Sequence, residues 1–260
     1  MDTRAGAGAG PGGRPGDRAS PGGRHGRPAR ADTRPAGQPV AAFDFDGTLT
    51  RRDSLLPFLV FVRGVATTAR AVVAESPRFG RVLLGRTSRD EAKEALLVRL
   101  LSGAELQQLS ESGRSFGERL VARRMRPAMR RRLDWHRATG HRVVIVSASP
   151  ALYLDEAGRR LGVDAVLATE LEVGADGRLT GRLAGRNCRG EEKAKRLWTW
   201  IDGSDHEPSG EVWAYGDSRG DAEMLALADV AVWVGWRRLL TRRIDRGGQQ
   251  YPSIPPGGRP

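Results

Sequence analysis

Short apolar runs that end in acidic or small polar residues constrain the fold of this chain more than any other feature. Runs of this kind are typical of strands that are buried on both faces of a parallel sheet. Helical patterns lie between them, so the sequence predicts an α/β fold with a doubly wound, Rossmann-like parallel sheet. The predicted strands are Val40 to Phe45, His141 to Ser147, Ala165 to Leu171, Val212 to Tyr215 and Val230 to Val234.

A long segment with helical patterns and few strand signals separates the first two predicted strands. Within it, Ser88 and Glu91 have the spacing of a capping box, and Leu96, Leu97, Leu100 and Leu101 form one helix face. We therefore predict a helical cap inserted after the first strand. The predicted parts of the chain are a disordered basic tail rich in Gly, Pro and Arg (residues 1–38), the core (39–52 and 134–240), the cap (53–133) and a C-terminal tail (241–260).

Three local signals predict further details of the fold. Ser149-Pro150 resembles a helix cap followed by a proline in the first turn. The segment Leu171 to Leu183 is typical of a hairpin that turns at Asp176-Gly177. A helix that stops at Gly203 is indicated by an apolar face made of Ala194, Leu197, Trp198 and Ile201.

Composition excludes several classes of protein. The single cysteine, Cys188, permits no internal disulfide and no cysteine-rich zinc site. No run reaches the roughly 18 apolar residues of a membrane span, and the N-terminus lacks the apolar core of a secretion signal. We expect a cytoplasmic protein. Its net charge of +12 is also compatible with a peripheral contact at the inner face of an anionic membrane. The arginine-rich segment 123–132 contains no aromatic residues that would stack on bases, so no nucleic-acid partner is expected.

The motif Asp44-Phe45-Asp46-Gly47-Thr48 follows the first predicted strand. Ligands of doubly wound sheets bind beyond the carboxyl ends of the strands, which is where this motif places its carboxylates. Asp44 can attack phosphorus to form an aspartyl-phosphate, and Asp46 can protonate the leaving alkoxide and then activate water. Thr48 offers a hydroxyl to an anionic ligand. The alternative is a strand that merely ends in solvated aspartates.

Two further positions complete a phosphate site. Ser147 closes the second predicted strand, where its hydroxyl and the adjacent amide of Ala148 can hold a phosphate oxygen. Lys193 opens a predicted helix and can neutralise charge on both Asp44 and a phosphoryl group. Taken alone, Ser147 is a weak signal because small polar residues end many strands, and Lys193 is more typical of a surface lysine.

A hard-metal site is predicted after the fourth strand. Asp217 and Asp221 lie four residues apart, where a loop entering a helix can turn both toward one side. Mg²⁺ prefers oxygen ligands, so Asp44, the carbonyl of Asp46, Asp217 and a water held by Asp221 form a sufficient set. The other interpretation of Gly216-Asp217-Ser218 is ordinary turn chemistry.

These motifs, in this order, are similar to the four motifs of the haloacid dehalogenase (HAD) superfamily, and the resemblance runs from about Val40 to Leu240. The segment Asn187 to Lys193 is especially similar to subfamily IB, the phosphoserine phosphatase-like enzymes. The resemblance implies a Mg²⁺-dependent phosphatase with an aspartyl-phosphate intermediate, the site roles given above, and a cap that covers the substrate. Dehalogenases need no proton donor two residues after the nucleophile, so Asp46 favours phosphate chemistry.

The substrate is left open by the sequence. Phosphoserine phosphatases usually carry paired glycines where this chain has Ala148-Ser149-Pro150, so phosphoserine is not expected. The apolar run Leu55 to Val62, followed by several arginines, resembles the cap region of bacterial phosphatidylglycerophosphate phosphatases, although packing of the cap against the core is the favoured explanation of the run. A phosphorylated lipid head group and a small metabolite such as histidinol phosphate are both retained. The alternative functions are a catalytically silent scaffold for anionic surfaces and a phosphotransferase with an acceptor other than water.

Overall fold

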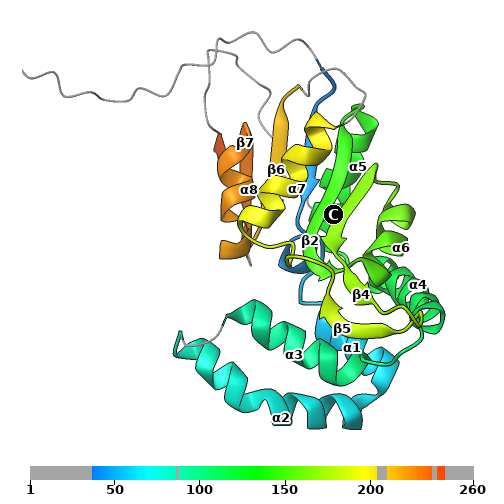
Figure 1. Ribbon diagram of the computed structural model, residues 1–260. Helices are drawn as coiled ribbons and strands as arrows, with labels where there is room; N and C mark the ends of the chain where they lie inside the picture. Colours follow the sequence, from blue (N-terminus) through cyan, green and yellow to red (C-terminus); the bar gives the residue numbers. More distant parts are fainter. Residues whose placement is uncertain (1–36, 86–87, 204–209, 236–238, 244–260) are drawn as a thin grey trace, which may run out of the picture. The chain divides into compact units, whose positions relative to one another are not determined.

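A computed structural model of the protein describes residues 37–85, 88–203, 210–235 and 239–243 (Figure 1). The predicted N-terminal tail, apart from its last two residues, and the predicted C-terminal tail beyond residue 243 lie outside these ranges. The main sheet has the strand order β3-β2-β1-β6-β7-β8. Its strands are β1 (Val40–Phe43), β2 (Arg142–Pro150), β3 (Ala165–Thr169), β6 (Val212–Gly216), β7 (Val230–Val234) and β8 (Leu239–Arg243).

All neighbouring strands of this sheet are parallel except β8, which pairs antiparallel with β7. The central strand β1 pairs with β2 on one side and β6 on the other, and Phe43 lies level with Ile145 and Tyr215. The carboxyl ends of these three strands therefore meet at one edge of the sheet. Asp44 directly follows β1, Asp217 directly follows β6, and Ser147 and Ala148 lie in the last four residues of β2, so residues distant in sequence come to one place.

The two faces of the sheet are covered by separate hydrophobic clusters. Alternate residues of a strand point to opposite faces, and Ala41 and Phe43 accordingly belong to one cluster while Val40 and Ala42 belong to the other. The first cluster includes residues of α5 (Pro127–Ala138) and α6 (Ala151–Leu161), and the second those of α7 (Glu191–Asp202) and α8 (Ala222–Leu227). Helices on both faces confirm the predicted doubly wound sheet.

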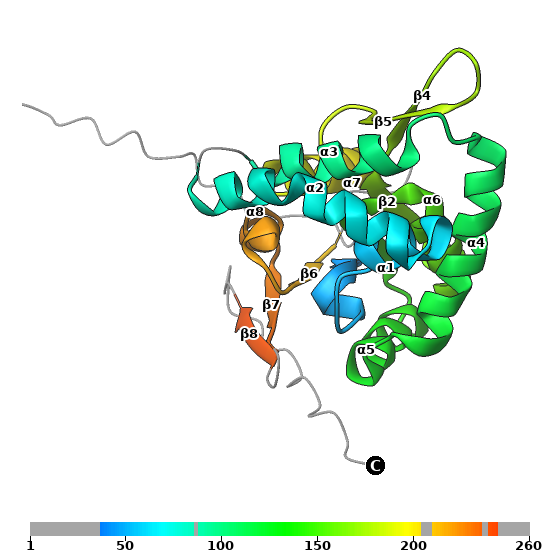
Figure 2. The same cartoon turned by 90° about the horizontal axis from the view of Figure 1, so that it is seen from below.

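The predicted helical cap is present between β1 and β2. Its helices are α1 (Leu55–Arg63), α2 (Val65–Leu83), α3 (Arg89–Leu101) and α4 (Leu106–Arg123). Helices α2 and α3 lie side by side in both views (Figure 2). Helix α4 packs closely on α6, because a Cβ at Gly113 would meet the carbonyl oxygen of Leu152 at 2.1 Å. The boundary predicted at residue 133 falls inside α5, which is one continuous helix in contact with β2.

Most local predictions are confirmed. Ser88 and Glu91 form both halves of the capping box, and the predicted hairpin consists of the antiparallel strands β4 (Leu171–Val173) and β5 (Leu179–Leu183). Helix α7 ends at Gly203 as expected. The prediction that Ser149 caps a helix is wrong, because β2 continues to Pro150 and α6 begins one residue later without a side-chain cap. No helix among the described residues is long and apolar enough to cross a membrane.

Candidate active site

The loop after β1 carries the first motif into contact with the loop after β6. Asp44 follows the last residue of β1, and a short helical turn spans Phe45–Leu49. Within this turn Gly47 has a φ of 84°, a conformation that favours glycine. A Cβ at Gly47 would meet Oδ2 of Asp217 at 2.1 Å. Glycine is therefore required both for the turn and for the close approach of the two loops.

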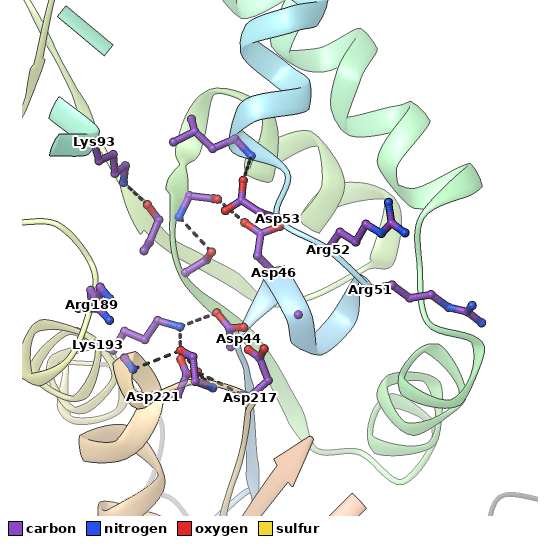
Figure 3. A pocket seen from close by; sticks show the side chains of 17 residues that line it. Asp44, Asp46, Arg51, Arg52, Asp53, Lys93, Arg189, Lys193, Asp217 and Asp221 are labelled. Carbon is purple, nitrogen blue, oxygen red and sulfur yellow. Dashed lines mark hydrogen bonds and ion pairs between the residues drawn. The ribbon is translucent and has the colours of Figure 1, made fainter. Parts of the chain in front are cut away.

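A buried lysine joins two of the predicted carboxylates. Nζ of Lys193 lies 2.5 Å from Oδ1 of Asp44 and 2.6 Å from Oδ1 of Asp221, and all three side chains are buried (Figure 3). Burial raises the pKa of Asp44 to about 7, while the charge of Lys193 opposes the rise. Burial lowers the pKa of Lys193, but Asp44 and Asp221 more than offset this, so the net pKa lies above its usual value. Lys193 therefore stays protonated and positively charged.

Asp221 is held from both sides of its carboxylate. Its Oδ1 accepts from Lys193, and its Oδ2 accepts from the backbone amides of Asp217 and Ser218 and from the Ser218 hydroxyl. These donors leave Asp221 little capacity for a direct metal bond and make it an anchor for the loop after β6. Asp217 is half-buried, and burial, followed by the charge of Asp221, raises its pKa.

The arrangement of these carboxylates fits a hard divalent cation. One oxygen from each of Asp44, Asp217 and Asp221 lies within 4.8 Å of the others. Among the residues that the structure describes, Oδ2 of Asp44 is buried without a hydrogen-bond partner. A buried carboxylate oxygen that accepts no hydrogen bond is costly unless another positive group, such as a cation, contacts it. Mg²⁺ prefers ligands that are all oxygen atoms, as these are.

Asp46 lies in a different environment from Asp44. Its Oδ2 accepts hydrogen bonds from Ser54, at 3.0 Å, and from Ser149. Ser54 Oγ is also 3.0 Å from the hydroxyl of Tyr153, which is fully buried. Burial, followed by the charge of Asp53, raises the pKa of Asp46 to about 6. Ser149, which was predicted to cap a helix, thus contacts Asp46, the predicted acid/base residue.

A cavity of about 370 Å³ collects most of the predicted residues. Thr48 is the exception: it is buried and does not line the cavity, and its hydroxyl donates to Oδ1 of Asp217 at 3.4 Å. Arg51, Arg52 and Asp53 also line the cavity, although the sequence analysis did not select them. Their position shortly after the first motif could have indicated them. The predicted residues at the cavity are Asp44, Asp46, Ser147, Ala148, Lys193, Asp217 and Asp221.

Lys93 of α3 reaches the cavity from the cap. Its Nζ donates to the carbonyl oxygen of Ala148 at 2.5 Å and to Oδ1 of Asn187 at 2.8 Å. Asn187 in turn donates to Asp90 of the same helix at 2.6 Å. Burial lowers the pKa of Lys93 to about 8. No sequence pattern indicated Lys93, because its position depends on how the cap packs against the core. Arg189 also lines the cavity; it lies in the segment Asn187 to Lys193, but the sequence analysis gave it no role.

Comparison with known proteins identifies the family. Residues 41–226 match the family model of the haloacid dehalogenase-like hydrolases, which covers most of the chain and all of the residues around the cavity. The chain belongs to this family. The predicted superfamily and its α/β fold with a cap after the first strand are thereby confirmed.

Several known proteins resemble this chain over most of its length. Protein CicA of Caulobacter vibrioides is 39% identical over 191 residues, which cover 73% of this chain and 83% of that protein. A histidinol-phosphatase of Neisseria meningitidis is 26% identical over 75% of this chain and 89% of its own length. A solved structure of a protein of unknown function from Bordetella pertussis Tohama I has a TM-score of 0.65, with 25% identity, over 74% of this chain and 88% of that one. The predicted enzyme class, a phosphatase of the HAD superfamily, agrees with these findings.

Proposed function

We propose that the protein is a Mg²⁺-dependent phosphomonoesterase that acts through an aspartyl-phosphate on Asp44. The observation that supports this most directly is the placement of two carboxylates, Asp44 and Asp46, in one cavity with different partners. Asp44 faces the Lys193 cation, whereas Asp46 faces only hydroxyl donors at hydrogen-bond distance. Lys193 opposes the rise of the Asp44 pKa to about 7, and a bound cation would oppose it further, so Asp44 would act as the anionic nucleophile. Asp46, with a pKa raised to about 6, would give and take a proton near neutral pH.

The two residues would share the reaction in two steps. In the first, an oxygen of Asp44 bonds to phosphorus, the ester P–O bond breaks, and the leaving alkoxide takes a proton from Asp46. In the second, Asp46 accepts a proton from water as the water oxygen attacks phosphorus, which releases inorganic phosphate and restores the Asp44 carboxylate. Ser147 and Ala148 line the cavity, where the serine hydroxyl and the backbone would bind phosphoryl oxygens, and Lys193 offsets negative charge on Asp44.

Asp44, the carbonyl of Asp46 and Asp217 are the residues that we propose hold Mg²⁺, with Asp221 acting through the Lys193 contact and the loop after β6. Bound there, the cation would supply positive charge that offsets the repulsion between the carboxylates and a phosphoryl group. The donor-free Oδ2 of Asp44 and the all-oxygen set support this assignment.

The proposed substrate is a phosphorylated small molecule, or a phospholipid head group such as that of phosphatidylglycerophosphate. The named activity of the histidinol-phosphatase relative favours the soluble class. The cap that we propose for residues 53–133 contributes Lys93 and Asp53 to the cavity, so the cap side of the cavity would select the leaving group.

The test is phosphate release from a panel of phosphomonoesters, with Mg²⁺ or EDTA, by the wild type and by Asp44→Asn. The panel would include histidinol phosphate in buffer and phosphatidylglycerophosphate in detergent micelles. Asp176→Asn, an exposed aspartate of the β4–β5 hairpin, is the matched control and should retain full activity. We expect release that requires Mg²⁺ and that falls by at least about 10³-fold in Asp44→Asn, since loss of a nucleophile removes the covalent route.

The alternatives predict other outcomes. No release from any compound, with anionic-surface binding unchanged in Asp44→Asn, would indicate a silent scaffold. Disappearance of the ester without an equal yield of inorganic phosphate, together with a newly phosphorylated alcohol, would indicate a phosphotransferase. Activity that EDTA does not change would contradict the proposed metal.

A further inference from the structure

A cluster of three buried hydroxyl groups adjoins one oxygen of Asp46, and two of the three contact that oxygen directly. Ser54 lies at the start of α1, Ser149 near the end of β2, and Tyr153 in α6, so the cap, the sheet and a core helix each contribute one. Ser54 and Ser149 both contact Oδ2 of Asp46, and Tyr153 contacts Ser54. At most a twentieth of any of these three side chains is exposed. Such a cluster is costly to bury unless every hydroxyl is satisfied.

The direction of these hydrogen bonds follows from the number of hydrogens available. A hydroxyl has one hydrogen to donate, and Ser54 donates it to Asp46, so the hydroxyl of Tyr153 must donate to Ser54. Ser149 likewise donates its hydrogen to Asp46. Oδ2 of Asp46 therefore accepts two hydrogen bonds.

The other carboxylate oxygen of Asp46 is engaged much more weakly. Among the described residues, the Thr50 hydroxyl contacts this oxygen, Oδ1, at 3.4 Å. The same hydroxyl has a better acceptor at 2.8 Å in the carbonyl oxygen of Arg52, and it has only one hydrogen. The two oxygens of Asp46 are thus unequal, with Oδ2 occupied by donors and Oδ1 left to carry a proton.

We propose that Ser54 and Ser149 are positioning residues that hold Oδ2 of Asp46, so that Oδ1 delivers the proton to the leaving alkoxide and later takes one from water. Tyr153 sets the direction of the Ser54 hydroxyl. This inference rests on the proposed function of Asp46 as acid/base residue. Neither serine touches the substrate in this scheme, because both act through the orientation of the carboxylate.

A leaving-group comparison distinguishes positioning from a general structural role. The phenolate of p-nitrophenyl phosphate leaves without a proton, whereas the alkoxide of an alkyl phosphate needs one. We would measure kcat/KM, which reports the step in which the alcohol leaves, for p-nitrophenyl phosphate and for the best alkyl phosphomonoester of the panel. The variants are Ser149→Ala, Ser54→Ala and Asp46→Asn. Thr68→Val is the matched control, because it removes a buried hydroxyl that donates to a backbone carbonyl in the cap.

We expect Ser149→Ala and Ser54→Ala each to lower kcat/KM for the alkyl phosphate about 10-fold or more, and for p-nitrophenyl phosphate less than about 3-fold. Asp46→Asn should show the same selectivity more strongly, and Thr68→Val should change neither value. Tyr153→Phe should lower the alkyl value by a smaller factor. Equal losses on both substrates, or no loss, in the two serine variants would overturn the inference if Asp46→Asn is selective. Absence of selectivity in Asp46→Asn would instead contradict the proposed role of Asp46.

Discussion

Lys193 illustrates how much a single buried charge decides in this site. It lies between the carboxylates of Asp44 and Asp221, and its own side chain is only 2% exposed. Replacing it with methionine would leave two buried carboxylates without their cation. We expect Lys193→Met to lower the free energy of unfolding in EDTA by about 3–5 kcal/mol, the range found when one member of a buried ion pair is removed.

Urea denaturation followed by circular dichroism would measure this effect. Lys195→Met on the same helix is the matched control, because Lys195 is exposed, and it should change stability by less than about 0.5 kcal/mol. A Lys193→Met variant as stable as the wild type would show that the carboxylates are satisfied by other means.

His136 provides a prediction for pH dependence. It is fully buried, its Nε2 lies 2.8 Å from the Tyr215 hydroxyl, and its Nδ1 lies 2.8 Å from Nδ1 of His141. Burial, followed by the nearby His141 and Arg132, lowers its pKa to about 3. The unfolded chain therefore takes up a proton as the pH falls through about 6.5 while the folded chain does not, so His136 lowers stability toward acid.

The linkage amounts to about 2 kcal/mol between pH 7 and pH 5. His136→Gln removes the titrating group and should flatten the pH dependence of the unfolding free energy by this amount. Tyr215→Phe keeps both imidazoles and should retain the wild-type slope. Equal slopes in His136→Gln and the wild type, measured by urea titration at each pH, would contradict the assignment.

The sequence predicted which residues gather at one place. Parallel strands bring their carboxyl ends together, and the first turn of α7 adds Lys193, so one cavity is lined by Asp44, Asp46, Ser147, Lys193, Asp217 and Asp221. Ser149 was assigned to a helix cap because Ser-Pro is a strong local signal. Tertiary contact with Asp46 determines its actual role, and such contact leaves no trace in local spacing.

At the level of elements, the contact between α4 and α6 depends on the absence of a side chain. A Cβ at Gly113 would meet the backbone of Leu152, which cannot move without moving α6. We expect Gly113→Ala to lower the free energy of unfolding by about 1–3 kcal/mol, as overpacking does. Gly80→Ala is the control, since nothing lies within 4 Å of its added Cβ and alanine favours a helix, so stability should rise by up to about 1 kcal/mol.

Thermal unfolding of both glycine variants would show whether each substitution lowers or raises the stability. A Gly113→Ala variant as stable as the wild type would mean that α4 shifts along α6 at little cost.

The elements themselves were predicted more reliably than their ends. The strands β1, β2, β3, β6 and β7 and the β4–β5 hairpin occur where apolar runs and turn residues indicate them. The strand β8, which extends the sheet past the boundary predicted at residue 240, was not predicted. Its sequence, LLTRR, is short and basic, and only pairing with β7 makes it a strand.

For the molecule as a whole, metal binding should appear as stability. A cation that binds the folded chain and not the unfolded one raises the unfolding midpoint by mass action. We expect millimolar Mg²⁺ to raise Tm by several degrees relative to EDTA, consistent with a stabilisation of about 1–3 kcal/mol. Asp217→Asn should remove this rise, whereas Asp176→Asn should preserve it. A Mg²⁺-induced rise that persists in Asp217→Asn would place the cation elsewhere.

The position of β1 in the middle of the sheet also has a consequence for biosynthesis. Val40 pairs with Arg142 and with Val212, so the strand that carries Asp44 leaves the ribosome long before either of its neighbours. Contacts between such distant segments require the closure of large loops, which slows folding. A nascent chain that has not yet reached residue 212 holds β1 with one unpaired edge, and an unpaired edge can associate with other chains. The residues that line the cavity can therefore come together only after Asp221 has been translated.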